Sequence, residues 1–215
     1  MNRTLALILL VATVAFAAAP LITPPFTGYD PDFFPVRIDR PAIQPAGYAF
    51  AIWSAIYLWL LLHAGFGLWQ RSDDPAWSPA RVPLILALVL GTVWLWIAGK
   101  SAVWGTVTIW IMALAALTAF LRSPTQPDRW LLSAPQAILA GWLTAASAVS
   151  TGVLMAGRGV LSNTASALAM LALVLILALI IQTRKPNMPV YGATVIWALA
   201  GVIAVNWGDM PLVAG

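Results

Sequence analysis

The chain has 215 residues, of which 61% are hydrophobic and only 8% are charged. Soluble domains average about 25% charged residues, and a soluble core of this size could not hide so much apolar surface. The composition therefore predicts an all-α polytopic membrane protein. The formal net charge of +4 comes from basic residues near the ends of apolar segments, a pattern that indicates membrane orientation and excludes nucleic acid as a partner.

Missing residue types restrict the chemistry further. The chain has no cysteine and no glutamate, and its single histidine is His63. Disulfides, thiolate metal sites and cysteine nucleophiles are therefore excluded. The seven aspartates lie mostly between the apolar runs, so no carboxylate pair within the membrane indicates a proton pump. We also find no phosphate-binding loop, dinucleotide motif or serine-nucleophile motif, and we predict no catalytic residue.

A helix needs roughly 20 mostly apolar residues to cross the hydrocarbon core of a membrane. The runs that approach or reach this length are 4–20, 46–69, 82–99, 102–121, 131–156, 160–182 and 189–207. Polar breaks or breaks rich in Pro and Gly separate them. The pattern predicts a transmembrane helical bundle of about seven spans.

The first run permits two interpretations. Arg3, the apolar stretch after it and the small residues up to Ala19 also fit a secretory signal peptide. Residues 1–19 are therefore either a retained helix or a segment removed from the mature protein.

Basic residues are distributed unequally over the two sides of a seven-span chain. The N-terminal side holds Arg3, Arg71, Arg81, Arg122, Arg129, Arg184 and Lys185. The other side holds Arg37, Arg40, Lys100 and Arg158. Because cytoplasmic loops carry the excess of Lys and Arg, we expect a cytoplasmic N-terminus and an external C-terminus.

A Pro-rich loop, residues 20–45, follows the first run. Its seven prolines disfavour helix, yet it also contains the aromatic residues Phe26, Tyr29, Phe33 and Phe34. A purely solvated linker would not need these rings. The loop is expected either to cover the outer mouth of the bundle or to rest in the lipid interface.

The helix after this loop places large aromatic residues at depth. Trp53 and Tyr57 are four residues apart and share one helix face, far from the membrane surface where Trp and Tyr usually lie. This depth predicts a protein-lined interior that holds a flat, apolar molecule. The alternative is that these aromatic residues only pack helix against helix.

On the fifth run, Trp142 neighbours a stripe of small residues that would allow close helix packing: Gly141, Ala145, Ala148 and Gly152. Thr144 and Ser147 lie nearby and either present hydroxyls to the interior or bond back to the carbonyl four residues earlier.

Several of these segments resemble one known family. The segment from Pro45 through Tyr48, Phe50 and Trp53 to Tyr57 is similar to the second-helix motif of the TspO/MBR family, the tryptophan-rich sensory proteins. Arg40-Pro41, Gly91-Thr-Val-Trp94, and Pro135 followed by Gly141-Trp142 fall in the same order as in its longer bacterial branch. The resemblance covers residues 1–156 and implies a five-helix membrane core there and residence in a bacterial inner membrane. The last two apolar runs lie outside it and predict two additional transmembrane helices over 157–215.

The resemblance also implies a ligand. Members of the family bind porphyrins and related tetrapyrroles, and in some cases sterol-like lipids. The residues expected to contact such a ligand are Tyr48, Phe50, Trp53, Tyr57, Trp94, Trp142, Thr144 and Ser147. Two positions depart from the family pattern, because Gly91 and Ser150 stand where asparagines are expected. The amide contacts that relatives make there cannot be assumed for this chain.

His63 is the chain's single histidine, and it lies within the second span. It is either an axial ligand to haem iron or an ordinary hydrogen-bonded histidine near the membrane surface. We expect no other metal ligand and no obligatory cofactor, with porphyrin or haem entering only as the bound ligand.

The sequence thus predicts an integral membrane protein that binds a planar hydrophobic ligand for sensing, regulation or transfer. Three alternatives remain open, namely a secondary transporter of a small hydrophobic solute, a porphyrin-degrading enzyme and a structural protein without a ligand. The expected partners are the lipid bilayer, the ligand and a second copy of the chain packed through small-residue faces.

Overall fold

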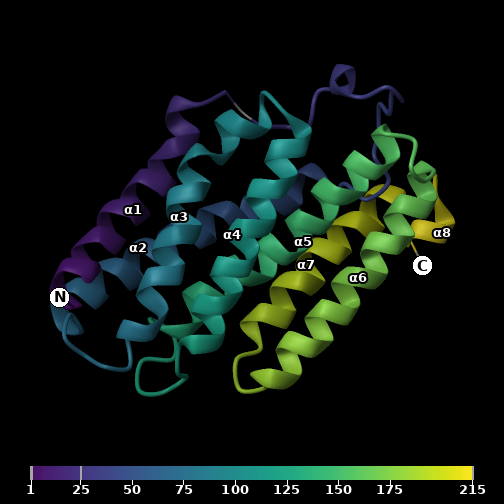
Figure 1. Cartoon of the computed structure of the whole chain (residues 1–215). Helices are drawn as coiled ribbons and strands as arrows, with labels where there is room; N and C mark the ends of the chain where they lie inside the picture. Colours follow the sequence, from purple (N-terminus) through teal and green to yellow (C-terminus); the bar gives the residue numbers. More distant parts are fainter. Residues whose placement is uncertain (1, 25, 215) are drawn as a thin grey trace.

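A computed structural model describes residues 2–24 and 26–214, and these form an all-helical bundle without strands (Figure 1). The long helices are α1 (Asn2–Ile22), α2 (Ile52–Gln70), α3 (Ser78–Ala98), α4 (Ala102–Arg122), α5 (Ser133–Gly157), α6 (Asn163–Arg184) and α7 (Val190–Asn206). The short elements are the 3₁₀ helices η1 (Pro31–Phe33) and η2 (Gly47–Ala51) and the terminal helix α8 (Pro211–Ala214). The predicted all-α fold is confirmed.

Each apolar run of the sequence coincides with one long helix. In the described residues, six helical segments are long and apolar enough to span a membrane, with η2 and α2 counted as one. The remaining run forms α7, which is apolar but has only 17 residues. The class of polytopic integral membrane protein therefore follows from both sequence and structure.

Helix α5 lies at the centre of the bundle. It packs against α4 on one side and against α6 and α7 on the other, while α1 packs against α2 and α3. Its small residues allow this central position, because a Cβ at Gly141 would lie only 2.7 Å from the carbonyl oxygen of Tyr191 on α7. The small-residue stripe is thus used within the chain, and the homodimer stays a prediction.

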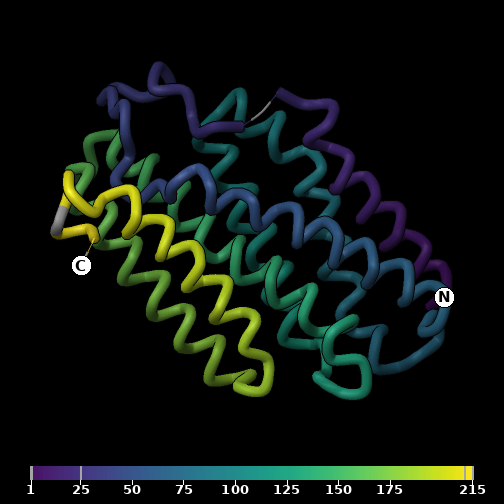
Figure 2. The backbone as a smooth tube through the Cα atoms, turned by 180° about the vertical axis from the view of Figure 1, so that it is seen from behind, coloured from purple at the N-terminus to yellow at the C-terminus, as the bar shows by residue number. Residues whose placement is uncertain are grey.

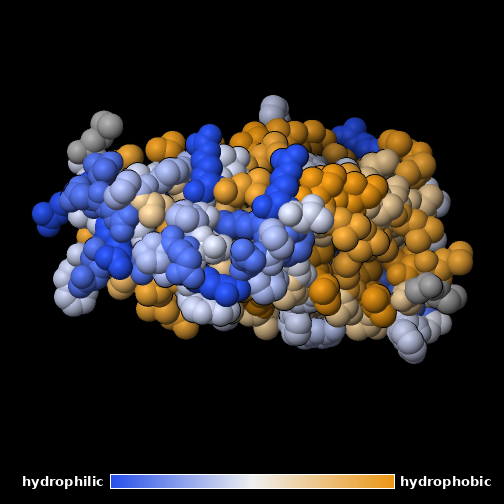
Figure 3. All heavy atoms as spheres, turned by 90° about the horizontal axis from the view of Figure 1, so that it is seen from below, coloured by the Kyte–Doolittle hydropathy of each residue, from blue (hydrophilic) through white to orange (hydrophobic). Residues whose placement is uncertain are grey.

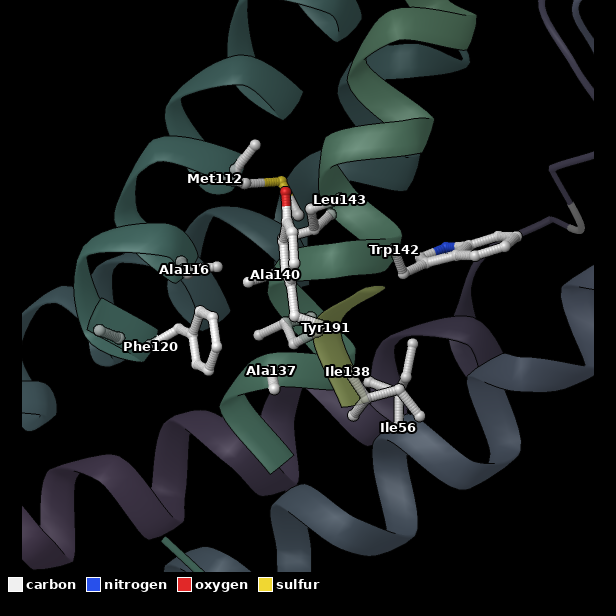
Figure 4. Packing of buried hydrophobic residues seen from close by; sticks show 14 of the residues in the cluster. Ile56, Met112, Ala116, Phe120, Ala137, Ile138, Ala140, Trp142, Leu143 and Tyr191 are labelled. Atoms are coloured by element: carbon white, nitrogen blue, oxygen red, sulfur yellow. The ribbon is translucent and has the colours of Figure 1, made fainter. Parts of the chain in front are cut away.

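Tyr191 connects α7 to this centre. Its ring stacks on that of Phe120 with centroids 5.6 Å apart, and its side chain reaches between α4 and α5 toward Met112 (Figure 4). Such aromatic pairs add to the stability that their burial provides. The two C-terminal helices are therefore packed into the bundle.

The bundle has two different ends (Figure 2). The N-terminus and the links 71–77, 123–132 and 185–189 form the hairpin end. Hydrophilic residues gather in one zone of this end, beside a broad hydrophobic surface (Figure 3). The links 23–46, 99–101 and 158–162 and helix α8 form the loop end. The basic residues are divided between these two ends as the sequence predicted.

The Pro-rich loop covers the loop end of the bundle. The backbone N–H of Val36 donates to the carbonyl of Gly157, and that of Ala46 donates to the carbonyl of Gly201, both at 3.0 Å. Ala42 is fully buried, and its N–H and carbonyl are bound by the side chains of Asn163 and Asn206. The packing of the loop on the bundle, expected of a cover, is confirmed, and the contact of its exposed residues with the lipid interface stays a prediction.

Candidate ligand-binding cavity

A cavity of about 320 Å³ lies beneath the loop. Ligand pockets in proteins typically enclose about 300–1,000 Å³, so the space suits a small organic molecule. Residues from α1, the loop and α2 line one side, and residues from α6 and α7 contribute to the lining as well. The sequence predicted contact residues on α2, α3 and α5, whereas the structure adds α1, the loop, α4, α6 and α7 to the wall.

Aromatic rings form one wall of this cavity. Trp53 and Tyr57 stack with centroids 5.3 Å apart, and the ring of Phe16 lies edge-on to both, at 5.9 and 5.2 Å. Trp142 lies edge-on to Trp53 at 6.0 Å and to Phe50 at 5.6 Å. The rings hold one another in edge and stacked arrangements, which fixes their faces before any ligand enters.

The position of Phe16 depends on Gly91. A Cβ at Gly91 would lie 2.4 Å from the Phe16 ring, closer than any real contact allows. The absence of a side chain on α3 therefore lets α1 place an aromatic ring in the wall. The sequence showed only that Gly91 lacks the amide of the asparagine expected there. The packing of Phe16 against Gly91 explains why a glycine stands at this position.

The loop contributes two further rings that the sequence prediction of the site missed. Phe26 lies edge-on to Trp94 with centroids 4.9 Å apart, and Tyr29 lies edge-on to Phe26 at 5.4 Å. Both line the cavity, as does Phe16. The sequence did indicate them, because a solvent-exposed loop would not need aromatic residues.

Ser150, the second departure from the family pattern, anchors the loop. Its hydroxyl lies 2.6 Å from the Tyr29 hydroxyl and 2.7 Å from that of Thr106, so the three form a chain of hydrogen bonds. Burial raises the pKa of the Tyr29 phenol, which keeps it protonated and able to donate. The serine thus joins cover to bundle.

Two tryptophans in the cavity wall have free donors. Of the twelve tryptophans, five donate their indole N–H to a protein acceptor in the described part of the chain: Trp59, Trp77, Trp94, Trp110 and Trp197. Across residues 2–24 and 26–214, no such acceptor serves Trp53 or Trp142, and the Tyr57 hydroxyl also has no partner. Because these residues line the cavity, their donors are available to a ligand that carries acceptors.

Five of the predicted contact residues meet at this cavity: Phe50, Trp53, Tyr57, Trp94 and Trp142. The other three lie elsewhere. Tyr48 is exposed and packs against Trp197. The hydroxyls of Thr144 and Ser147 donate to carbonyls four residues earlier on α5, which is the second of the two roles the sequence left open. Whether the five residues bind a ligand stays a prediction.

His63 lies at the hairpin end. Its Nδ1 is 2.7 Å from the carbonyl oxygen of Leu131, and its ring stacks on Trp77 with centroids 5.0 Å apart. It is buried and does not line the cavity. Within the residues that the structure describes, no group of His and Asp side chains could hold a metal ion. The geometry gives His63 a packing role between α2 and the 123–132 link.

A polar network closes the hairpin end. The Asp128 carboxylate accepts hydrogen bonds from Arg71 at 2.7 Å and from the indole N–H of Trp77 at 2.9 Å. The Arg71 hydrogen bond is the largest cause that holds the pKa of Asp128 below its usual range. The Arg81 guanidinium donates to the carbonyls of Asn2, Arg71 and Ser72 and so joins the first residues of the chain to the α2–α3 link.

Lys185 closes the same end between α4 and α6. Its ammonium group donates to the carbonyls of Phe120 and Ser123 at the C-terminal end of α4. Burial lowers the pKa of Lys185 to about 8. Cations at this position also interact favourably with the helix dipole.

The fold and the cavity define a polytopic integral membrane protein with an aromatic chamber at one end of its helices. A sequence model of the TSPO-like protein family matches residues 3–215, and the chain therefore belongs to this family. Neither the curated proteins nor the solved structures gave a match. The family match includes α6 and α7, which the initial resemblance did not cover, and the domain boundary at residue 156 stays a prediction.

Proposed function

We propose that this protein binds a planar hydrophobic ligand of the tetrapyrrole class in the cavity beneath its loop, for sensing, regulation or transfer. The observation that carries the proposal is the aromatic wall around Trp53, Tyr57 and Trp142, with free N–H and O–H donors in an otherwise apolar space. Apolar pockets with a few placed polar groups are typical binding sites for such molecules. Sterol-like lipids fit the apolar lining but would leave most of the donors without acceptors.

A flat conjugated ring matches this wall in two ways. Its faces and edges can add to the aromatic contacts already present, each worth about 0.5–1.5 kcal/mol beyond burial. Its heteroatoms or carbonyl substituents can accept from the indole N–H groups of Trp53 and Trp142. The ligand would thereby satisfy donors that the protein leaves open.

The direct test is a titration with protoporphyrin IX, followed by quenching of tryptophan fluorescence in lipid nanodiscs. Ala146 lines the cavity on α5, and Ala146→Phe should fill part of it and weaken binding at least about tenfold, or 1.4 kcal/mol. Ala200→Phe makes the same change on an exposed face of α7 and should bind as the wild type does. Fluorescence that no tetrapyrrole quenches would remove the proposal and favour a structural protein without a ligand.

A second candidate function is degradation of bound porphyrin. The close pair of Trp53 and Trp142, both in the cavity wall, favours it because oxidisable indoles would flank the ligand. Protein and porphyrin are mixed in air, in light and in darkness. Loss of porphyrin absorbance that needs both light and wild-type protein, and that Trp53→Phe abolishes, supports the enzyme. Stable absorbance with quenched fluorescence supports a binding protein.

We further infer that the hairpin end faces the cytoplasm of a bacterial cell and that the cavity opens toward the outer side of its inner membrane. The distribution of seven basic residues against four supports this orientation. A reporter fused to the C-terminus should be active only on the outer side, and a cytoplasmic signal would reverse the topology.

A further inference from the structure

The cavity has a second wall with a different chemistry. The lining residues contributed by α6 and α7 are all aliphatic, namely Leu171, Val174, Ala198, Leu199 and Val202. Aromatic residues of the lining come from α1, the loop, η2, α2, α3 and, for Trp142, α5, whereas α4 contributes only Ile109 and Met112. The C-terminal helices thus supply a surface that differs from the part of the lining that carries the aromatic rings.

This difference does not result from a lack of aromatic residues on α7. Trp197 immediately precedes the lining residue Ala198, but its indole N–H donates to the carbonyl of Ala49 and its ring packs against Tyr48. The one large aromatic residue at this level of α7 is therefore used to hold η2. Small and branched side chains are left to face the cavity.

The aliphatic wall continues along α5 toward the loop end. Ala146, Val149 and Val153 line the cavity at helical spacing, beyond Trp142 in the direction of the loop. The rise of 1.5 Å per residue makes this strip about 16 Å long from Trp142 to Val153. Such a strip can accommodate an extended hydrocarbon chain along its length.

We propose that the ligand is bipartite, with a flat conjugated head against the aromatic wall and a branched or linear aliphatic tail against α6, α7 and the outer part of α5. The proposal rests on the proposed function and narrows its ligand class to tail-bearing ring compounds. Aliphatic side chains surround a flexible chain with many dispersion contacts but offer no ring face and no hydrogen bond. The free donors, by contrast, lie on the side of the head.

The source of the tail is testable, because an acyl chain of the bilayer could occupy the same strip. Moving a tail from lipid to protein gives little hydrophobic gain, so discrimination must come from packing. The probes are methyl pheophorbide and pheophytin, which share one conjugated head and an ester and differ in the methyl or phytyl group. Both are titrated in nanodiscs, and binding is followed by quenching of tryptophan fluorescence.

For the wild type, pheophytin should bind about tenfold more tightly than methyl pheophorbide. Leu199→Phe should remove this ratio by filling the aliphatic strip, so that pheophytin binds no more tightly than methyl pheophorbide. Leu171→Ala removes contacts without adding bulk and should reduce the ratio as well. Ile196→Phe places the same ring on an exposed face of α7 and should retain the full ratio.

Each result bears on one claim. If neither probe binds, both the proposed function and the tail-binding strip are contradicted. If both probes bind equally and Leu199→Phe changes neither, the site is real but the bipartite ligand is wrong, and a bilayer chain occupies the strip.

Discussion

The two ends of the bundle are closed by different means. At the hairpin end, charged and polar side chains bind free carbonyls and one another, as Asp128, Arg81 and Lys185 show. At the loop end, a Pro-rich cover lies over an apolar chamber, and its Tyr29 is held to α5 by a single chain of hydroxyls. The hairpin end is held by side-chain hydrogen bonds and an ion pair, whereas the loop end encloses an apolar cavity.

This difference assigns separate tasks to the two ends. Directional bonds among buried groups are costly to break, so the hairpin end is expected to stay closed. In the cover, backbone and asparagine bonds hold residues 36–46, but Phe26 and Tyr29 are held by aromatic edge contacts and one chain of hydroxyls, so this part can open at smaller cost. We therefore expect a ligand to enter from the loop end.

The largest effect on stability is expected from Asp128→Ala. The change leaves the buried indole N–H of Trp77 without an acceptor, at a cost of about 2 kcal/mol for that donor alone. It also removes the partner of Arg71. Thermal unfolding in detergent should show a clearly lower melting temperature with unchanged tetrapyrrole affinity in the folded fraction.

The matched control is Asp73→Ala in the same link. Asp73 is exposed, and its carboxylate accepts only from the neighbouring Ser72 hydroxyl among the described residues. This variant should unfold at the wild-type temperature. Equal losses for both variants would contradict the assignment of the hairpin end as a specific network.

Gly91→Val should have the next largest effect on stability, and this effect should arise at the loop end. The new side chain would displace the Phe16 ring from the wall, and overpacking of this kind costs about 1–3 kcal/mol. Unlike Asp128→Ala, it should weaken tetrapyrrole binding together with stability. Fluorescence titration of the folded variant measures this, and wild-type affinity would mean that Phe16 is not part of the site.

Ser150→Ala should have a smaller effect that is confined to the cover. It removes the hydroxyl that bonds to both Tyr29 and Thr106, and a hydrogen bond of this kind stabilises the fold by about 1 kcal/mol. Hydrogen exchange of residues 26–36 should become faster and ligand release should accelerate. Thr118→Ala removes a hydroxyl that bonds only within α4 and should change neither quantity.

The smallest effect is expected from pH. Because the pKa of Asp128 is lowered in the folded state, its contribution to stability is present above the unfolded pKa and is lost as pH falls through the folded pKa. Melting temperatures measured from neutral pH down to about pH 2 should fall more for the wild type than for Asp128→Asn. Parallel curves would show that another group controls the acid response.

The sequence predicted the helices well because hydrophobic runs and Pro or Gly breaks report directly on spans. It also identified Trp53, Tyr57 and Trp142, since depth in a span follows from position along it, while Phe50 and Trp94 were identified through the family resemblance. Contacts between distant segments are a different matter. No spacing rule connects Phe16 to Gly91, because their meeting depends on how α1 packs against α3.

Two further features were hidden for related reasons. Hydroxyl residues on a helix can bond to their own backbone or across to a neighbour, and only packing decides between these roles. Thr144 and Ser147 bond back and also reach the Tyr191 hydroxyl and the Ile109 carbonyl. Ser150 instead bonds across to Tyr29 and Thr106. The contribution of α6 and α7 to the cavity was likewise left undecided, because apolar faces toward lipid and toward a cavity have the same composition.

The central claim is that a tetrapyrrole occupies the chamber at the loop end and leaves the hairpin end untouched. Because the chain contains no cysteine, single cysteines can report on each end separately. Ala146→Cys lines the cavity, and Ala76→Cys lies in the α2–α3 link at the other end. Maleimide labelling of Ala146→Cys should slow strongly when protoporphyrin IX is added, while labelling of Ala76→Cys should stay the same. Unchanged labelling at Ala146→Cys, or equal protection at both positions, would contradict the account.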